Sequence, residues 1–179
     1  MTRFVGIDPS GETGIVILDK DGNYLDGFEI ASKALDKTEK IDDIITEIVI
    51  NLEFDDVIAI EGFSYSSKGK GIDFQFGLGH AIRLQLFRTG MKWIDVAPTQ
   101  VKKFATGNHQ AAKDNMSVPI FKHWGFEHPS NNVRDAYVLA QVARAVKLGT
   151  ATTKYQQEVI QAILSPQKTK QKKGKVANT

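Results

Sequence analysis

Phe4-Val5-Gly6-Ile7-Asp8-Pro9-Ser10-Gly11-Glu12-Thr13-Gly14 opens the chain and carries most of the information about its architecture. The first residues form a short apolar run, which is typical of a buried strand, and the run ends on the carboxylate of Asp8. Ser10-Gly11 predicts a turn, and the apolar residues from Gly14 to Asp19 predict a second strand. The chain therefore begins with two adjacent strands, and an acid lies where the first one ends.

The rest of the sequence alternates between strand-like and helix-like spacing. Asp21-Gly22-Asn23 is a hairpin signal, and Pro119 is expected to break or kink the helix that contains it. Strands are expected over 3–8, 14–19, 24–30, 57–60 and 93–96, and helices over 38–52, 73–88, 99–104, 110–123, 132–147 and 153–164. A meander followed by βαβ units predicts an α/β fold, with a mixed five-stranded sheet flanked by helices.

Length and composition set limits on the class of protein. The 179 residues suffice for one domain, and 41% hydrophobic and 25% charged residues are a normal globular balance. The chain has no cysteine, which excludes disulfides and thiolate zinc sites. It has no apolar run of the roughly 20 residues that a membrane span needs, so we expect no membrane association. Because the first residues enter a predicted strand directly, we expect no signal peptide.

The net charge of +2 hides an uneven distribution along the chain. Residues 165–179 contain five lysines and no acid, so subtracting five from +2 leaves residues 1–164 at −3. We expect one folded domain over 1–164 and a basic, disordered tail over 165–179. This tail either meets a polyanion or is a solvated terminus, and charge alone does not choose between the two.

Three acids stand out against the predicted elements. Asp8 and Glu61 follow buried strands, at the edge where α/β sheets collect ligands, although Asp8 could equally cap a turn. Asp135 lies in the first turn of a helix and taken alone is a capping residue. Taken together, the three acids can converge on one sheet edge. Carboxylates prefer hard cations such as Mg²⁺, and two such ions would support phosphodiester hydrolysis.

Four segments of the chain resemble those of RuvC-type Holliday-junction resolvases, within the RNase H-like superfamily. The resemblance covers residues 3–147, and its segments occur in the family's order and at its spacing. They are 4–14, 58–61, 96–113 (with Val96-Ala97-Pro98-Thr99, Thr106-Gly107 and Ala111-Ala112-Lys113) and 134–140. Any one of these motifs is weak, but four in sequence are fairly specific.

The resemblance implies an RNase H-like fold and a homodimer that cleaves four-way DNA junctions with Mg²⁺ or Mn²⁺, two ions per active site. It implies a cytoplasmic location, in a bacterial cell or a phage-infected host. It assigns Asp8, Glu61 and Asp135 as catalytic metal ligands and Lys113 as a catalytic basic group near the scissile phosphate. The alternative for Lys113 is a solvated helix lysine.

Asn132 departs from the family pattern. Three residues before the helix acid the family usually has a further ligand, Asp or sometimes His, on the same helical face. An amide oxygen is a weaker magnesium ligand than a carboxylate. Either the site works with three acids and Asn132, or Asn132 stands where a native Asp has been replaced to inactivate the enzyme. On sequence grounds, Asn132→Asp is expected to keep or raise nuclease activity.

The segment 62–71 after Glu61 combines aromatic residues with lysines beside the proposed site. Phe63 or Tyr65 could stack on a base at the crossover; alternatively, Phe63 is buried in the core and Tyr65 lies on the surface. The expected phosphate contacts are Lys68, Lys70, Lys102, Lys103 and the tail lysines. The helix over 73–88 is expected to turn its apolar residues to one side, forming either a dimer surface or ordinary core; these residues are Phe74, Leu78, Ala81, Leu84 and Phe87.

Two other classes of function fit part of the pattern. The segment 6–14 also resembles the phosphate loop of actin-like ATPases and sugar kinases, but those have two RNase H-like domains and this chain has room for one. A protein that binds branched DNA without cutting it would fit Asn132. The four histidines show no zinc spacing and are interpreted as structural or surface residues.

Overall fold

The computed structural model describes residues 2–63, 71–112 and 115–165. Its five strands form one sheet in the order β3-β2-β1-β4-β5. The strands are β1 (Phe4–Asp8), β2 (Glu12–Leu18), β3 (Tyr24–Ala31), β4 (Val57–Glu61) and β5 (Trp93–Val96). β1, β2 and β3 are antiparallel neighbours joined by short turns, whereas β4 runs parallel to both β1 and β5. The mixed five-stranded sheet predicted from the sequence is confirmed.

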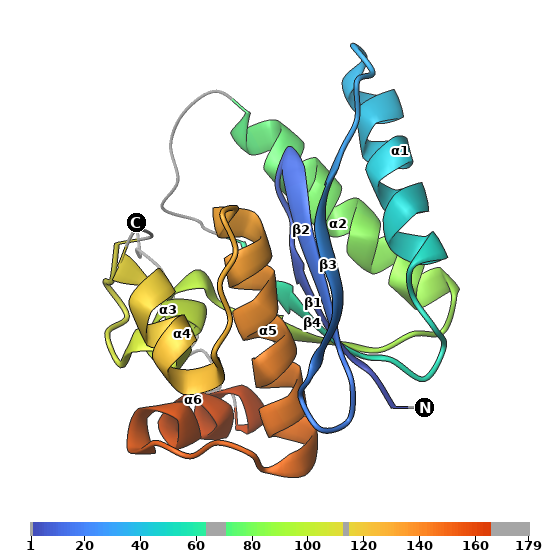
Figure 1. The fold of residues 1–179 in the computed structure, drawn as a ribbon. Helices are drawn as coiled ribbons and strands as arrows, with labels where there is room; N and C mark the ends of the chain where they lie inside the picture. Colours follow the sequence, from blue (N-terminus) through green and yellow to red (C-terminus); the bar gives the residue numbers. More distant parts are fainter. Residues whose placement is uncertain (1, 64–70, 113–114, 166–179) are drawn as a thin grey trace, which may run out of the picture.

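Helices cover both faces of this sheet (Figure 1). Helices α1 (Lys37–Ile50) and α2 (Ile72–Arg88) lie on one face, over a cluster of buried aliphatic residues from the strands. Helix α5 (Asn131–Leu148) lies on the other face, and α3 (Pro98–Thr106), α4 (Ser117–Trp124) and α6 (Lys154–Leu164) pack around it. Within the described ranges, no helix has the length and apolarity to cross a membrane.

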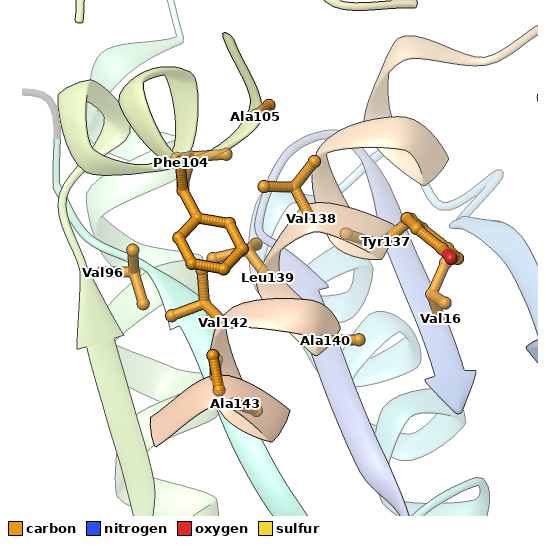
Figure 2. Packing of buried hydrophobic residues seen from close by; sticks show 14 of the residues in the cluster. Val16, Val96, Phe104, Ala105, Tyr137, Val138, Leu139, Ala140, Val142 and Ala143 are labelled. Carbon is orange, nitrogen blue, oxygen red and sulfur yellow. The ribbon is translucent and has the colours of Figure 1, made fainter. Parts of the chain in front are cut away.

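Helix α5 is the centre of the second layer. From Val133 to Ala145 nearly every side chain is buried, far more than the one apolar face that its sequence pattern predicts. Figure 2 shows Phe104 of α3 beside Val142 and Tyr137 next to Val16 of β2, so the helix contacts other elements on both of these sides. A helix enclosed in this way cannot shift without disturbing the whole core. Its first turn is therefore held in a fixed position relative to the sheet.

Two details of the helices differ from the sequence-based expectations. The helix expected over 110–123 begins later, at Ser117, so Pro119 is its third residue and breaks nothing. Proline is tolerated there because the first N–H groups of a helix have no intrahelical partner. On α2 the buried apolar side chains are Leu78, Ile82 and Leu86, whereas two members of the expected apolar side, Leu84 (49%) and Phe87 (73%), are exposed, so these two are not part of the core.

Candidate active site

A pocket of about 270 Å³ opens at the ends of β1 and β4 and beside the start of α5. Its lining includes the three acids predicted from the sequence, Asp8, Glu61 and Asp135, together with Asn132. These residues come from three elements that are far apart in the chain. The structure therefore brings the predicted acids to one place, and their catalytic role stays a prediction.

The sheet register explains why Asp8 and Glu61 meet. Ile7 and Ile60 are partners in the parallel pair of β1 and β4, so the next residue of each strand is an acid at the same sheet edge. Asp8 is 4% exposed and belongs to the last residue pair between β1 and β2. A carboxylate so little exposed is found where a cation or hydrogen-bond donors offset the cost of its burial.

Two glycines let α5 approach the sheet closely. A Cβ atom on Gly6 would lie 1.9 Å from the carbonyl oxygen of Ala136, and one on Gly14 would lie 2.2 Å from that of Asn132. Neither position can therefore carry a side chain unless α5 moves away. This close packing places Asn132 and the 6%-exposed Asp135 beside Asp8.

Arg83 of α2 holds the end of β4 in place, a role that sequence reasoning missed. Its guanidinium donates to the Glu61 carbonyl oxygen at 3.1 Å and to the Gly79 carbonyl oxygen at 2.8 Å. It also forms an ion pair with Asp95 of β5, with an Nη2–Oδ1 distance of 2.5 Å. The available signal was a charged residue at a helical position flanked by the core residues Ile82 and Leu86.

Phe63 lies half-buried at the pocket wall. Its ring stacks on Phe76 with centroids 5.1 Å apart and lies 4.5 Å from the ring of His80. The guanidinium of Arg83 lies 4.7 Å from the Phe63 centroid, within the range of a cation–π contact. The ring packs on α2 and also lines the pocket, so Phe63 is not enclosed in the core, and its stacking on a DNA base stays a prediction.

The other residues predicted to contact DNA fall into three groups. Lys102 of α3 lines the pocket. Lys103 instead forms an ion pair with Glu158 of α6, with an Nζ–Oε2 distance of 2.8 Å that lowers the pKa of the Glu158 carboxyl. The remaining predicted residues lie outside the described residues; these are Tyr65, Lys68, Lys70, Lys113 and the tail lysines.

Asn132 is held by two acceptors on neighbouring strands. Its Nδ2 donates to the main-chain carbonyl oxygen of Glu12 at 2.8 Å and to Oε1 of Glu29 at 2.9 Å. The same Oε1 accepts a hydrogen bond from Oγ of Ser130 at 2.5 Å. Ser130 is the N-cap of α5 and accepts from the Val133 N–H. Glu29 thus ties β3 to the first turn of the helix that carries Asp135.

Comparison with solved structures identifies the fold. Neither a protein-family model nor a curated protein matches the sequence. The structure of Thermus thermophilus RuvC superposes with a TM-score of 0.65 at 20% identity, covering 84% of this chain and 98% of that one. The structure of T. thermophilus RuvC in complex with a Holliday junction substrate superposes with a TM-score of 0.65 at 19% sequence identity, covering 85% of this chain and 99% of that one. The chain has the RNase H-like fold of RuvC. The fold expected from the sequence is confirmed.

Within this RuvC-like fold, the pocket offers the oxygen ligands that a hard divalent cation prefers. Asp8, Glu61 and Asp135 supply carboxylates, and Asn132 supplies an amide. Among the described residues, however, no three Asp, Glu or His side chains lie close enough together to hold a metal ion. The residues therefore fit a Mg²⁺ or Mn²⁺ site by the chemistry of their oxygen ligands.

Proposed function

We propose that the chain is a structure-selective DNA endonuclease that resolves Holliday junctions and related branched DNA by metal-dependent hydrolysis of phosphodiesters. The observation that carries the proposal is the pocket in which Asp8, Glu61 and Asp135 meet within a RuvC-like fold. A RuvC structure of this fold is described in complex with a Holliday junction substrate. The proposal transfers that class of substrate to this chain.

Asp8, Glu61, Asp135 and Asn132 would hold Mg²⁺ or Mn²⁺, and we propose two ions in each site. When bound, such ions activate a water molecule and stabilise the oxygen that leaves the phosphodiester. The protein's own part is to position the ligands: Arg83 holds the Glu61 backbone, and close packing of α5 on the sheet holds Asp135 beside Asp8.

We propose that DNA lies across the pocket mouth, with Lys102 contacting a phosphate and Phe63 presenting a ring against a base exposed at the crossover. Lys68, Lys70, Lys103, Tyr65 and the tail at 165–179 are proposed further contacts, and Lys113 a basic group near the scissile phosphate. Two symmetric nicks need two sites related by a two-fold axis, so we propose a homodimer. Such an enzyme would act in the cytoplasm of a bacterial or phage-infected cell.

A second candidate is a protein that binds branched DNA without cutting it. One observation favours it, the amide at Asn132, where the family usually has an acid. A fold that retains the binding surface but lacks a complete metal site would select junctions and leave them intact.

The test is cleavage of a labelled four-way junction with Mg²⁺ or Mn²⁺, beside a duplex of the same arm sequence. The wild-type chain is compared with Asp8→Asn and with Asp42→Asn, which neutralises an exposed acid on α1, across the sheet from α5. Paired symmetric nicks that Asp8→Asn abolishes and Asp42→Asn preserves would support the enzyme. Junction binding without cutting would support the second candidate. Nucleotide binding without junction preference would overturn both.

A further inference from the structure

The hydrogen bonds around Asn132 determine which end of its amide faces the pocket. Both of its partners, the Glu12 carbonyl and the Glu29 carboxylate, are acceptors. An amide can satisfy two acceptors only through its nitrogen, which has two hydrogens to donate. The amide oxygen is therefore the polar atom of this side chain left for the pocket that Asn132 lines.

We infer that Asn132 is a native member of this site and that Glu29 is its positioning residue. Glu29 accepts from Asn132 and from the N-cap Ser130 through the same oxygen, so it links the orientation of the amide to the start of α5. Its negative charge also lies at the positive end of the helix dipole. This inference rests on the proposed nuclease function, and it adds to the site a residue of β3 that does not line the pocket.

An acid at position 132 conflicts with this arrangement. An aspartate has no hydrogen to donate, so Asn132→Asp would lose both hydrogen bonds and set a second negative charge against Glu29. The side chain would turn away, or the first turn of α5 would move. From these contacts we therefore expect the opposite of what the sequence alone predicts, namely that an acid at position 132 lowers activity. Asn132 and Glu29 form a pair of one amide donor and one carboxylate acceptor, and a second carboxylate at position 132 would leave the pair without a donor.

The pairing predicts a specific rescue. In the double variant Asn132→Asp/Glu29→Gln, the glutamine amide can donate to the new aspartate, and the net charge of the pair is unchanged. Glu12 offers a matched control, because it contacts Asn132 through its main-chain carbonyl and its exposed side chain takes no part. Asn132→Asp/Glu12→Gln removes a nearby charge without restoring a donor, so it is expected to give no rescue.

The experiment compares the wild-type chain, Asn132→Asp, Glu29→Gln and the two double variants in two assays. The first is the thermal midpoint without metal, at neutral pH. The second is junction cleavage as a function of Mg²⁺ concentration. We expect Asn132→Asp to lower the midpoint, to slow cleavage about tenfold or more and to raise the Mg²⁺ concentration for half-maximal rate, since a charge-assisted hydrogen bond is lost. Glu29→Gln, and not Glu12→Gln, should restore part of all three quantities, because it replaces the hydrogen bond between positions 29 and 132 while the one to the Glu12 carbonyl stays lost.

Several results would overturn the inference. Equal rescue by Glu12→Gln would mean that the effect is general charge repulsion. If the effects of Asn132→Asp and Glu29→Gln simply add in the double variant, the two residues are not coupled. Coupling in the thermal midpoint with no change in the Mg²⁺ dependence would leave Glu29 a merely structural residue. If the wild-type chain cuts no junction, the proposed function is wrong. The thermal midpoints of the same variants without metal still test whether Asn132 and Glu29 are coupled.

Discussion

Gly14 of β2 lies against the backbone of Asn132 so closely that a Cβ atom on the glycine would sit 2.2 Å from the Asn132 carbonyl oxygen. Both neighbours there are backbone, which cannot move aside as a flexible side chain could. The first turn of α5 can therefore lie directly on β2 only because Gly14 has no side chain.

Gly14→Ala is expected to destabilise the protein by about 1–3 kcal/mol or more, because the new methyl group overpacks a backbone contact. It should also reduce cleavage more than the loss of folded protein explains, because α5 carries Asp135. Urea unfolding and junction cleavage measure the two effects. Gly11→Ala is the matched control, since a Cβ there meets nothing within 4 Å; equal effects of the two substitutions would contradict the packing argument.

Arg83→Met is expected to cost roughly 1–3 kcal/mol, because it removes the donor to the Glu61 carbonyl and the ion pair with Asp95. Cleavage should fall about tenfold or more as the end of β4 loses its support. Arg83→Lys should recover only part of either loss, since one ammonium cannot reproduce the guanidinium's fork of donors. Arg88→Met, at the exposed end of the same helix, serves as control, and a similar loss there would refute the assigned role.

Phe63→Leu keeps an apolar side chain at the pocket wall and removes the aromatic face. If Phe63 stacks on a base at the crossover, the preference for junction over duplex should fall by about fivefold or more. Competition binding in Ca²⁺, where the DNA stays intact, measures the ratio. Phe54→Leu, at a ring that is 71% exposed between α1 and β4, is the control. An unchanged preference in Phe63→Leu would remove the stacking role.

Asp36 caps α1, and hydrogen bonds from the N–H groups of Glu39 and Thr38 hold its pKa below the usual 3.8. A lowered pKa in the folded state contributes stability above the unfolded value, and this contribution is lost as pH falls through the folded value. The wild-type chain should therefore unfold at a higher temperature than Asp36→Ala at about pH 7, and the difference should shrink below pH 3.8. Asp36→Asn, which caps without charge, should show less of this pH dependence. A pH-independent difference between the wild-type chain and Asp36→Ala would contradict the assignment.

Local patterns were sufficient to predict the elements and the acids. Short apolar runs located β1 and β4, and the acid at the end of each run was read from its position there. The helical spacing of α1 was likewise correct, with Ile44 and Ile48 buried. These features are local, so a single segment of sequence contains the information.

Other features depended on contacts between distant segments. The buried face of α2 could not be chosen from the sequence, because the helix is apolar on more than one side, and the sheet selects Leu78, Ile82 and Leu86. The place of Arg83 between Ile82 and Leu86 does not say which groups it binds, and the role of Glu29 could not be predicted because an isolated glutamate carries no pattern. Their partners are 22 and 103 residues away in the chain, at Glu61 and Asn132.

The sequence by itself determined the order of strands and helices, the five-stranded α/β fold and the three acids that meet in the pocket. Periodicity and strand-end position are properties of short segments, and the physics of burial acts on them directly. Only the tertiary structure decided the orientation of the Asn132 amide and the residue that opposes it. A hydrogen bond between β3 and α5 has no local signature, because it exists only once Gly14 has let the helix settle onto the sheet.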